Sequence, residues 1–515
     1  ANGNLLQESV NMGEPMMRFW MAHWEFIYLF VALIYKIFPS VWTILIIHTT
    51  VIALGALPVF WLAKDKLKHE IIAVVFAYAY LLYPAMQNAN LLDVHGVTFA
   101  APFLLFAFYF LQKRSYGWFA FHAFFAVMSR EDSALILIMM AAYAFFIMKE
   151  RKVGIITGIL CAAWFLVWYK RMTIRAMLGL PEFVIMEGAE THWSHLANMK
   201  TDSLYLIKFL AKKHNIIYFF NLFGPVFFLS LLSPSTLLIA TPIFAINLLS
   251  SYFYTHDVSH HYSATIAPFI FISAIYGAEK ICDWTRLKLK NDQKLFILSV
   301  IVGIFSLMFF FMSSNTFDAV NWKITDHHKK IKSVIEQVPT EASLTATRKI
   351  AVHAAERHEL YLFNEHVNTV DYIMYDFYAP TVRLLTRSSF VLPYHWPDND
   401  SIRKVLRNRD YGIVEYTDGI CLFEKGANYE AGLQKLALSD GSNINNKKKA
   451  RLTDQIDFIG FNKHDILKYY IQPDKLGKIY WKHALHFTCF LQTDSVLQDI
   501  LEFSFKLKKD DIELN

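Results

Sequence analysis

Long apolar runs dominate the chain as far as residue 313, and polar and apolar residues alternate over short distances beyond it. A helix needs about 20 predominantly apolar residues to cross a bilayer, with roughly 17 as the practical lower end. The runs therefore predict an α-helical, multi-pass membrane domain over residues 1–313, with about ten spans. The predicted spans are 41–63, 71–86, 94–111, 116–128, 133–148, 153–169, 216–232, 234–250, 262–280 and 295–313.

Two apolar runs are shorter than an ordinary span. Residues 26–38 stop at Pro39, which predicts a re-entrant or interfacial segment. The run 116–128 predicts either a broken helix or one buried among its neighbours, because helix ends within a bilayer must be surrounded by protein.

The residues after 313 predict soluble structure in two parts joined by a linker. Residues 314–440 combine helical stretches at 321–337 and 401–409 with short β-type runs, which indicates a small α/β domain. Residues 441–450 form a polar, basic linker, and residues 451–515 predict a β-sandwich-like segment. The predicted strands are 343–346, 359–363, 370–375, 412–416, 420–424, 456–461, 478–481 and 485–491. Neither part shows a catalytic constellation, which suggests an accessory role in binding glycans or partners.

The loops between spans set the expected orientation, because Lys and Arg are enriched in cytoplasmic loops. With the amino terminus outside, the cytoplasmic loops carry thirteen Lys and Arg residues, whereas the short outer loops carry only Arg18 and Arg130. The longer outer loop 170–215 adds seven, which weakens the contrast without reversing it. Ten crossings return the chain to the outside, so we expect a protein of the cell membrane whose C-terminal region is extracytoplasmic.

Composition narrows the classes of partner and site. The 515 residues are 55% hydrophobic and 18% charged, with a formal net charge of +6. Most basic residues of the first half lie between apolar runs, where they orient helices, so nucleic acid is not an expected partner. The four cysteines form neither a disulfide framework nor a metal knuckle. The sequence has no phosphate-binding loop, dinucleotide fingerprint or serine-nucleophile elbow.

The remaining polar motifs of the membrane domain fall at the outer ends of the predicted spans. Ionisable residues at membrane depth are costly and usually functional, so the agreement of separate segments on one face indicates a site. The segments are 23–25, 93–95, 129–132, 170–215 and 256–262.

Asp93 and His95 form the first candidate pair, two residues apart where a span begins. A carboxylate beside an imidazole can act as a catalytic base pair, a metal-binding pair or a clamp for phosphate and hydroxyl groups. The alternative is a helix cap with an interfacial histidine. The shared face favours the functional interpretation.

Charged residues in two other loops extend this candidate site. Arg130, Glu131 and Asp132 lie between two apolar runs. Arg130 can hold a phosphate and either acid can orient sugar hydroxyls, whereas a loop salt bridge is the alternative. His23 and Glu25 precede the short run at 26–38, and functional and structural roles are equally open for them.

A histidine-rich segment precedes the ninth predicted span. It contains the candidates His256, Asp257, His260, His261 and Tyr262. Spacing alone does not define a metal site here, because zinc sites usually show defined ligand pairs with supporting groups around them. Contact with a ligand or phosphate is favoured over a metal, and His256, Asp257 and His260 are weak metal candidates. The cofactor is left open, with a divalent metal ion as one possibility.

Together, these motifs resemble a family of predicted bacterial and archaeal membrane proteins, the domain of unknown function numbered twenty seventy-nine. His23–Phe26 resembles the family's His-Phe-Ser-Pro segment, and Asp93–Gly96 resembles its Asp-Phe-His-Pro motif. Arg130–Asp132 is similar to its Lys-Glu-Asp, and His261–Tyr262 to its late His-Tyr pair. The resemblance covers roughly residues 1–426. The family is in turn distantly similar to the GT-C glycosyltransferases, which use polyprenyl-phosphate sugars.

The chain departs from the family's motifs at three positions, with Glu25 for Ser, Gly96 for Pro and Arg130 for Lys. The family's Tyr-Asp-Leu-Gly segment, which follows its first span, would precede Ala1. We therefore expect the natural gene to encode an upstream span followed by an acid-bearing outer loop. In GT-C enzymes an acid of that first outer loop commonly acts as the base.

The resemblance implies a membrane glycosyltransferase that moves a sugar from a lipid-phosphate carrier to an extracytoplasmic acceptor. Its catalytic candidates are Asp93, Glu131, Asp132 and Glu25. The residues expected to bind substrate are His23, His95, Arg130, His261 and Tyr262. Membrane lipid and a polyprenyl-phosphate sugar are the expected partners. The alternatives are a transporter or flippase, which favours charges at the bilayer midplane and inverted repeats, and a non-catalytic envelope scaffold.

Overall fold

A computed structural model of the chain describes most of the residues up to 432 and three later segments. The described residues are 7–8, 16–17, 23–177, 195–200, 202–284, 289–316, 323–363, 365–376, 399–432, 485–493, 496–507 and 512–514. The described residues between 23 and 316 belong to one compact unit, and those between 323 and 432, with the strands after 485, belong to a second. The short strands β1 (Gln7–Glu8) and β2 (Met16–Met17) pair with each other.

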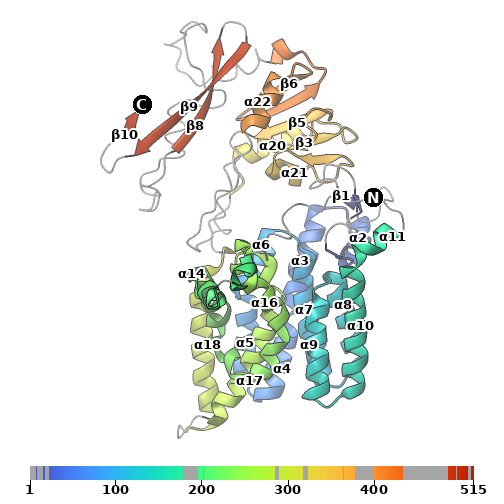
Figure 1. Cartoon of the computed structure of the whole chain (residues 1–515), viewed down its shortest axis with the longest axis vertical. Helices are drawn as coiled ribbons and strands as arrows, with labels where there is room; N and C mark the ends of the chain where they lie inside the picture. Colours follow the sequence, from blue (N-terminus) through green and yellow to red (C-terminus); the bar gives the residue numbers. More distant parts are fainter. Residues whose placement is uncertain are drawn as a thin grey trace. The chain divides into compact units, whose positions relative to one another are not determined.

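The first unit is helical, and its longer helices run side by side (Figure 1). Its α-helices are α2 (Ile27–Ile37), α3 (Val41–Leu54), α4 (Ala56–Leu67), α5 (Glu70–Leu81), α6 (Pro84–Leu92), α7 (Gly96–Gln112), α8 (Tyr116–Ser129), α9 (Ser133–Phe146), α10 (Arg151–Tyr169), α11 (Arg171–Met177), α13 (Tyr205–Leu210), α14 (Lys213–Phe223), α15 (Pro234–Leu237), α16 (Thr241–Leu249), α17 (Ala267–Trp284) and α18 (Asn291–Ser313). Its 3-10 helices are η1 (His195–Lys200), η2 (Gly224–Val226), η3 (Leu229–Leu232), η4 (Leu238–Ala240), η5 (Phe253–His256) and η6 (His261–Ser263).

Four helical segments among the described residues are long and apolar enough to cross a membrane, judged by length and composition. They are Val41–Leu67, Glu70–Leu92, Arg151–Tyr169 and Asn291–Ser313. Shorter apolar helices accompany them at Ile27–Ile37, Gly96–Gln112, Ser133–Phe146 and Pro234–Leu249. The multi-pass character follows from these helices, whereas the total of about ten spans stays a prediction.

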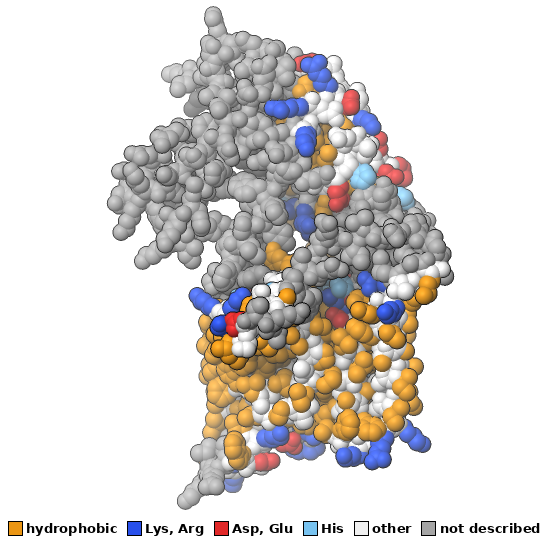
Figure 2. All heavy atoms as spheres, in the orientation of Figure 1, with side chains coloured by type: hydrophobic (Ala, Val, Ile, Leu, Met, Phe, Trp, Pro, Cys, Tyr) orange, Lys and Arg blue, Asp and Glu red, His pale blue; other side chains and the backbone are white. Residues whose placement is uncertain are grey.

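The flank of the helical unit is apolar on its outside. On α10, Ile159 and Leu160 are each 65% exposed. Figure 2 shows hydrophobic side chains covering this flank, with Lys and Arg side chains gathered at its lower end. An apolar surface of this extent bounded by basic residues is typical of a protein that faces lipid.

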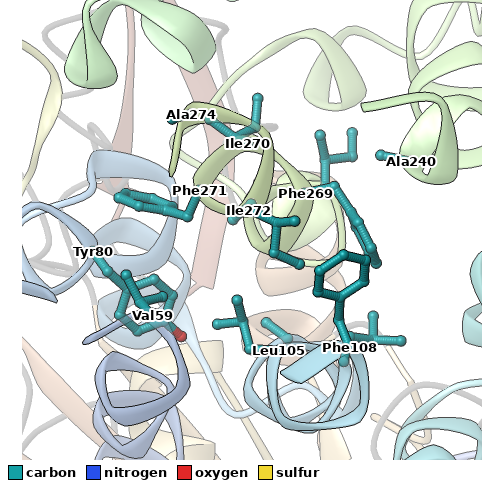
Figure 3. Close-up of a cluster of buried hydrophobic side chains, with 14 of the residues drawn as sticks. Val59, Tyr80, Leu105, Phe108, Ala240, Phe269, Ile270, Phe271, Ile272 and Ala274 are labelled. Atoms are coloured by element: carbon teal, nitrogen blue, oxygen red, sulfur yellow. The ribbon is translucent and has the colours of Figure 1, made fainter. Parts of the chain in front are cut away.

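A cluster of buried apolar side chains holds α17 against α4, α5 and α7 (Figure 3). Phe271 packs edge-to-face on Tyr80 with ring centroids 5.5 Å apart, and Phe269 packs on Phe108 at 6.4 Å. Aromatic pairs favour this edge-to-face geometry because the positive ring edge meets the negative ring face. Element η6, which leads into α17, contacts α7, and its His261 stacks on His95 at the start of that helix.

The run predicted at 216–232 is interrupted, because α14 and η2 end at Val226, a turn follows at 227–228, and η3 begins at Leu229. The run predicted at 234–250 forms one apolar helical stretch, Pro234–Leu249, in which η4 separates α15 from α16. Pro225 and Pro234 cannot donate a backbone hydrogen bond, and Phe227 and Phe228 have positive φ angles of 52° and 56°. An apolar run looks the same in sequence whether its backbone is continuous or broken, so hydrophobicity alone does not reveal these breaks.

The short run at 116–128 forms the continuous helix α8, so a broken helix is not observed, and residues 126–129 at its end are buried. Trp118, Phe121 and Phe124 on α8 are 56%, 48% and 49% exposed. Their opposite face packs on α7. The helix is therefore half-buried, with one apolar face open.

A five-stranded sheet forms the centre of the second unit, in the order β4-β3-β5-β7-β6. Strand β3 pairs in parallel with β4 and β5, and β7 pairs antiparallel with β5 and β6. The elements are α20 (Asp326–Ile335), β3 (Leu344–Ala346), α21 (Arg348–His353), β4 (Leu360–Leu362), β5 (Tyr372–Asp376), α22 (Asn399–Arg407), β6 (Tyr411–Thr417) and β7 (Ile420–Lys425). Each strand predicted between 343 and 424, and both predicted helices, overlap an observed element.

Alternate residues of β7 point into two different apolar cores. Ile420 and Leu422 join the cluster that contains α20, whereas Cys421 and Phe423 join the cluster that contains α22. A strand with a side-chain period of two behaves this way when both faces of its sheet are covered. The α/β architecture predicted for this part of the chain is therefore observed.

A three-stranded antiparallel sheet follows later in the chain, in the order β10-β9-β8. Its strands are β8 (Leu485–Thr493), β9 (Val496–Leu507) and β10 (Ile512–Leu514). Strand β8 matches the run predicted at 485–491. The linker 441–450 and the strands predicted at 456–461 and 478–481 lie outside the described residues, so the β-sandwich stays a prediction.

Candidate functional site

The polar motifs occupy helix ends of the first unit. Asp93 ends α6 and His95 precedes α7, while Arg130 ends α8 and Asp132 precedes α9. His261 lies in η6, shortly before α17. Because these helices pack against one another, side chains that are distant in sequence meet at their ends.

Glu131 connects the amino-terminal segment to the α8–α9 loop. Its carboxylate lies 2.5 Å from His23 Nδ1 and accepts a 2.8 Å hydrogen bond from the backbone N–H of Trp24. Arg130 Nη2 lies 3.1 Å from His23 Nε2. The guanidinium can only donate, so His23 Nε2 accepts its hydrogen bond. The proton of the ring is then on Nδ1, which donates a hydrogen bond to Glu131. The three side chains thus fix one tautomer of His23.

Glu25 and Gly96 make a second link, at two of the positions that depart from the family's motifs. The backbone N–H of Gly96 donates to Glu25 Oε1 at 3.1 Å. A proline at position 96 has no N–H, so this hydrogen bond requires another residue. A Cβ atom on Gly96 would lie 2.5 Å from the carbonyl oxygen of Ser129. The two departures from the family's motifs therefore go together, because Glu25 needs the N–H of residue 96 and Gly96 supplies it.

Asp93, His95 and His261 form a compact group of metal-ligand type. One ligand atom from each lies within 4.8 Å of the others. His95 Nδ1 is 2.5 Å from Asp93 Oδ1, and the rings of His95 and His261 stack with centroids 3.7 Å apart. Asp93 is half-exposed, whereas His261 is buried.

The two groups lie within Coulombic range of each other. His261 interacts electrostatically with Arg130 and His23, and Arg130 interacts with Glu25 and Tyr262. The structure therefore brings together nine of the side chains that the sequence predicts for the site. They are His23, Glu25, Asp93, His95, Arg130, Glu131, Asp132, His261 and Tyr262.

Buried charge distinguishes this region from an ordinary loop. Glu131 is 1% exposed and Arg130 is 7% exposed, and Arg130 Nε lies 3.2 Å from Asp132 Oδ2. Removing charges from water is expensive unless they are paired, so such groups in a membrane protein point to a functional role. Carboxylates nevertheless outnumber guanidinium groups in this cluster.

The weak metal candidates of the histidine-rich segment make other contacts. His256 directs its two ring nitrogens to Asn215 Oδ1 and, at 2.6 Å, to the carbonyl oxygen of Ser250. Asp257 accepts a hydrogen bond from the backbone N–H of Ser259, and His260 Nδ1 lies 3.0 Å from Ser259 Oγ. These bonds fold the segment that leads to His261. A metal role for the three residues stays a prediction.

Two residues near the site were not predicted from the sequence. His48 is buried in α3, with Nε2 2.5 Å from Thr98 Oγ1, and it lies within Coulombic range of Asp93. Arg171 lies within Coulombic range of Glu131. His48 could have been noticed in the sequence, because it is a histidine within an apolar run. Arg171 could not, because a basic residue in a loop is explained by helix orientation.

Comparison with known proteins identifies the family to which the chain belongs. No curated protein matches the chain. A model of a family described as predicted membrane proteins, DUF2079, matches residues 1–422. That range includes the helical unit with its polar site and nearly all of the five-stranded sheet. The chain belongs to this family of predicted membrane proteins.

Proposed function

We propose that the protein is a membrane glycosyltransferase that moves a sugar from a polyprenyl-phosphate carrier to a hydroxyl group of an extracytoplasmic acceptor. The proposal rests on one observation. The Asp93–His95 pair lies beside the cluster around Arg130, at one end of an apolar helical unit. A lipid-linked phosphate would present its reacting bond at such a place, because its chain stays among the lipids while its headgroup reaches the membrane edge.

The proposed reaction is a displacement at the anomeric carbon of the sugar. The acceptor oxygen forms a bond to that carbon, and the bond from the carbon to the phosphate oxygen breaks. The carrier leaves as polyprenyl phosphate, and the acceptor's proton passes to a base. Asp93 suits this role because its carboxylate is half-exposed, so that with Oδ1 beside His95 the other oxygen, Oδ2, would take the proton.

Arg130 is the proposed partner of the leaving phosphate. Its contacts with His23 and Asp132 involve Nη2 and Nε. A guanidinium carries five N–H donors, so donor capacity remains for phosphate oxygens. Held in place by buried neighbours, it would stabilise the charge that develops as the bond breaks. His261 and Tyr262 would line the same side of the headgroup.

Glu131 and Glu25 are proposed as positioning residues instead of bases. Glu131 already accepts hydrogen bonds from the Trp24 backbone and His23, and Glu25 accepts one from Gly96. A carboxylate engaged in this way is a poor proton acceptor, because protonation would break its hydrogen bonds. Their contribution would be to fix His23 and the start of α7.

The test is transfer from a radiolabelled polyprenyl-phosphate sugar by the full chain in native membranes. Asp93→Asn should lower the transfer rate by about 100-fold or more, as expected for loss of a general base. Asp65→Asn is the matched control, because Asp65 is also a partly exposed aspartate, and it pairs with Lys113 away from the site. Equal rates in the wild type and Asp93→Asn would contradict the assignment.

Arg130 provides the second arm of the same test. Arg130→Gln should abolish transfer. Arg130→Lys should retain a measurable rate, because lysine keeps the positive charge and is the residue of the family's motif. Movement of the lipid-linked sugar across the membrane without transfer would favour the flippase alternative and overturn the proposal.

A further inference from the structure

We propose that Asp93, His95 and His261 bind a divalent transition-metal ion such as zinc. The proposal stands on the arrangement of the three side chains and does not require the glycosyl-transfer reaction. Two imidazoles with one carboxylate form a common ligand set of catalytic zinc sites, in which a fourth position stays open.

The distances suit this ligand set. One ligand atom from each residue lies within 4.8 Å of the others. Ligand atoms around a tetrahedral zinc ion are about 3.3 Å apart, given zinc–nitrogen bonds of about 2.0–2.1 Å. Asp93 Oδ1 and His95 Nδ1 are 2.5 Å apart, and the whole group lies within 4.8 Å. The ligand atoms would therefore reach tetrahedral spacing through side-chain shifts of about 1–2 Å.

His261 carries a polar atom that needs a partner. The side chain is only 7% exposed, and its Nδ1 has no hydrogen-bond partner among the described residues. Buried nitrogen atoms of this kind are rare in folded proteins, because leaving one unpaired after removal from water is unfavourable. A bound cation would satisfy it.

Supporting contacts hold the ligands in place. Thr98 Oγ1 donates to the carbonyl oxygen of His95 at 2.6 Å, and His48 Nε2 approaches the same hydroxyl. Asn88 on α6 donates to the carbonyl oxygen of Val258 at 3.2 Å, which ties the helix before Asp93 to the segment before His261. Metal sites depend on such outer contacts to orient their ligands.

The charge balance also favours a cation. The described residues gather Glu25, Asp93, Glu131 and Asp132 there, against Arg130 and Arg171. Negative charge is therefore in excess, which would repel a phosphate. A divalent ion would reverse this local balance and could contact a phosphate oxygen through its open position. Asp93 has two carboxylate oxygens, so binding through one leaves the other to accept a proton.

The ligands also indicate which ions should bind. Imidazole nitrogen suits zinc and neighbouring transition metals, whereas magnesium and calcium prefer oxygen ligands. Zinc should therefore bind in the presence of a large excess of magnesium.

The test is calorimetric titration of zinc chloride into the purified full chain in lipid nanodiscs, after chelator treatment and without any sugar donor. We expect one zinc site, and magnesium in about tenfold excess over zinc should not displace the bound zinc. Asp93→Asn and His261→Gln should each weaken zinc binding by more than about 100-fold, beyond the effect of altering an outer contact. Asp93 is half-exposed, so that variant should fold normally even if His261→Gln does not.

His122→Gln is the matched control, because His122 is also a buried histidine and contacts the carbonyl oxygen of Trp118 on α8 instead of the metal group. It should bind zinc as the wild type does. Absence of zinc binding by the wild type, or unchanged affinity in Asp93→Asn, would overturn the metal site. Zinc binding that depends on Asp93 in a protein without transfer activity would support the metal site and overturn the proposed reaction alone.

Discussion

At the residue scale, the contact between Glu25 and Gly96 shows how the site depends on one missing side chain. Gly96 begins α7 and approaches the carbonyl oxygen of Ser129 so closely that a Cβ atom would lie 2.5 Å from it. Any larger residue must push α7 away from the α8–α9 loop. The distance between the Asp93 and Arg130 segments therefore depends on this glycine.

Gly96→Ala should lower the free energy of unfolding by about 1–3 kcal/mol, the usual cost of adding atoms to a packed region. The measurement is thermal or denaturant unfolding of the purified chain. Gly117→Ala is the control, because Gly117 also lies at a helix start but has no atom within 4 Å of its Cβ position. That change should be neutral or stabilise by up to about 1 kcal/mol. Equal effects of the two changes would show that the close approach is not important.

His327 in the second unit predicts a dependence of stability on pH. Its Nε2 lies 3.2 Å from Asp376 Oδ2, and its Nδ1 lies 3.2 Å from Asp418 Oδ2. The hydrogen bond with the buried Asp376 raises the pKa of His327 above its ordinary value. A histidine whose pKa is raised by folding stabilises the folded protein fully at pH values below its pKa in the unfolded chain, about 6.5. This stabilisation is lost as the pH rises through the pKa of the folded protein.

Cys421 reports on this unit, because it is fully buried on β7. The denaturant midpoint for its reaction with a thiol reagent should fall as pH rises above about 6.5. His327→Gln should remove that pH dependence, whereas His353→Gln, which alters an exposed histidine on α21, should keep it. A pH dependence that persists in His327→Gln would assign it to another group.

The candidate site was largely predictable at this scale, and its geometry was not. Sequence placed Asp93, His95 and Arg130 at helix ends on one face, because apolar run lengths and loop charges determine which end each residue occupies. They do not determine which helices are neighbours. The stacking of His95 on His261, and the support from His48, depend on that packing and could not be inferred.

At the scale of elements, run length predicts helices well where the backbone is regular and poorly where it is interrupted. The runs at 153–169 and 295–313 became single helices, α10 and α18. The run at 216–232 is interrupted by a turn at Phe227 and Phe228. Proline and positive φ angles set those boundaries, and a count of apolar residues does not include them. In the second unit, short continuous apolar runs predicted the strands, because a strand whose sheet is covered on both faces buries successive residues.

The helix α10 provides a test of membrane insertion. Leu160 lies at its middle and is 65% exposed, so it should contact lipid. Leu160→Lys should disfavour insertion of α10 by about 3 kcal/mol, whereas Leu160→Val should have little effect. A glycosylation reporter placed after the helix measures the inserted fraction. Unchanged insertion of the Lys variant would argue against α10 as a span.

At the scale of the whole molecule, the orientation stays a prediction from loop charges, and accessibility can test it. A single cysteine replacing the exposed Glu341 should react with a membrane-impermeant thiol reagent in intact cells. A cysteine replacing the exposed Asn291, at the start of α18, should react only after the cells are opened. Cys161, Cys282 and Cys421 are buried, which limits background labelling, and both variants also carry Cys489→Ser to remove the fourth cysteine. Labelling at 291 alone in intact cells would invert the orientation.

The proposed function requires the polar cluster at the helix ends to bind a lipid-linked phosphate. The most direct measurement is photocrosslinking of the full chain in membranes with a polyprenyl phosphate that carries a diazirine beside the phosphate, followed by mass spectrometry of the labelled peptides. We expect labels on peptides containing residues 93–96, 130–132 or 256–262, and loss of those labels when unmodified polyprenyl phosphate competes. Labels spread along the lipid-facing helices α10 and α18, unaffected by competitor, would contradict it.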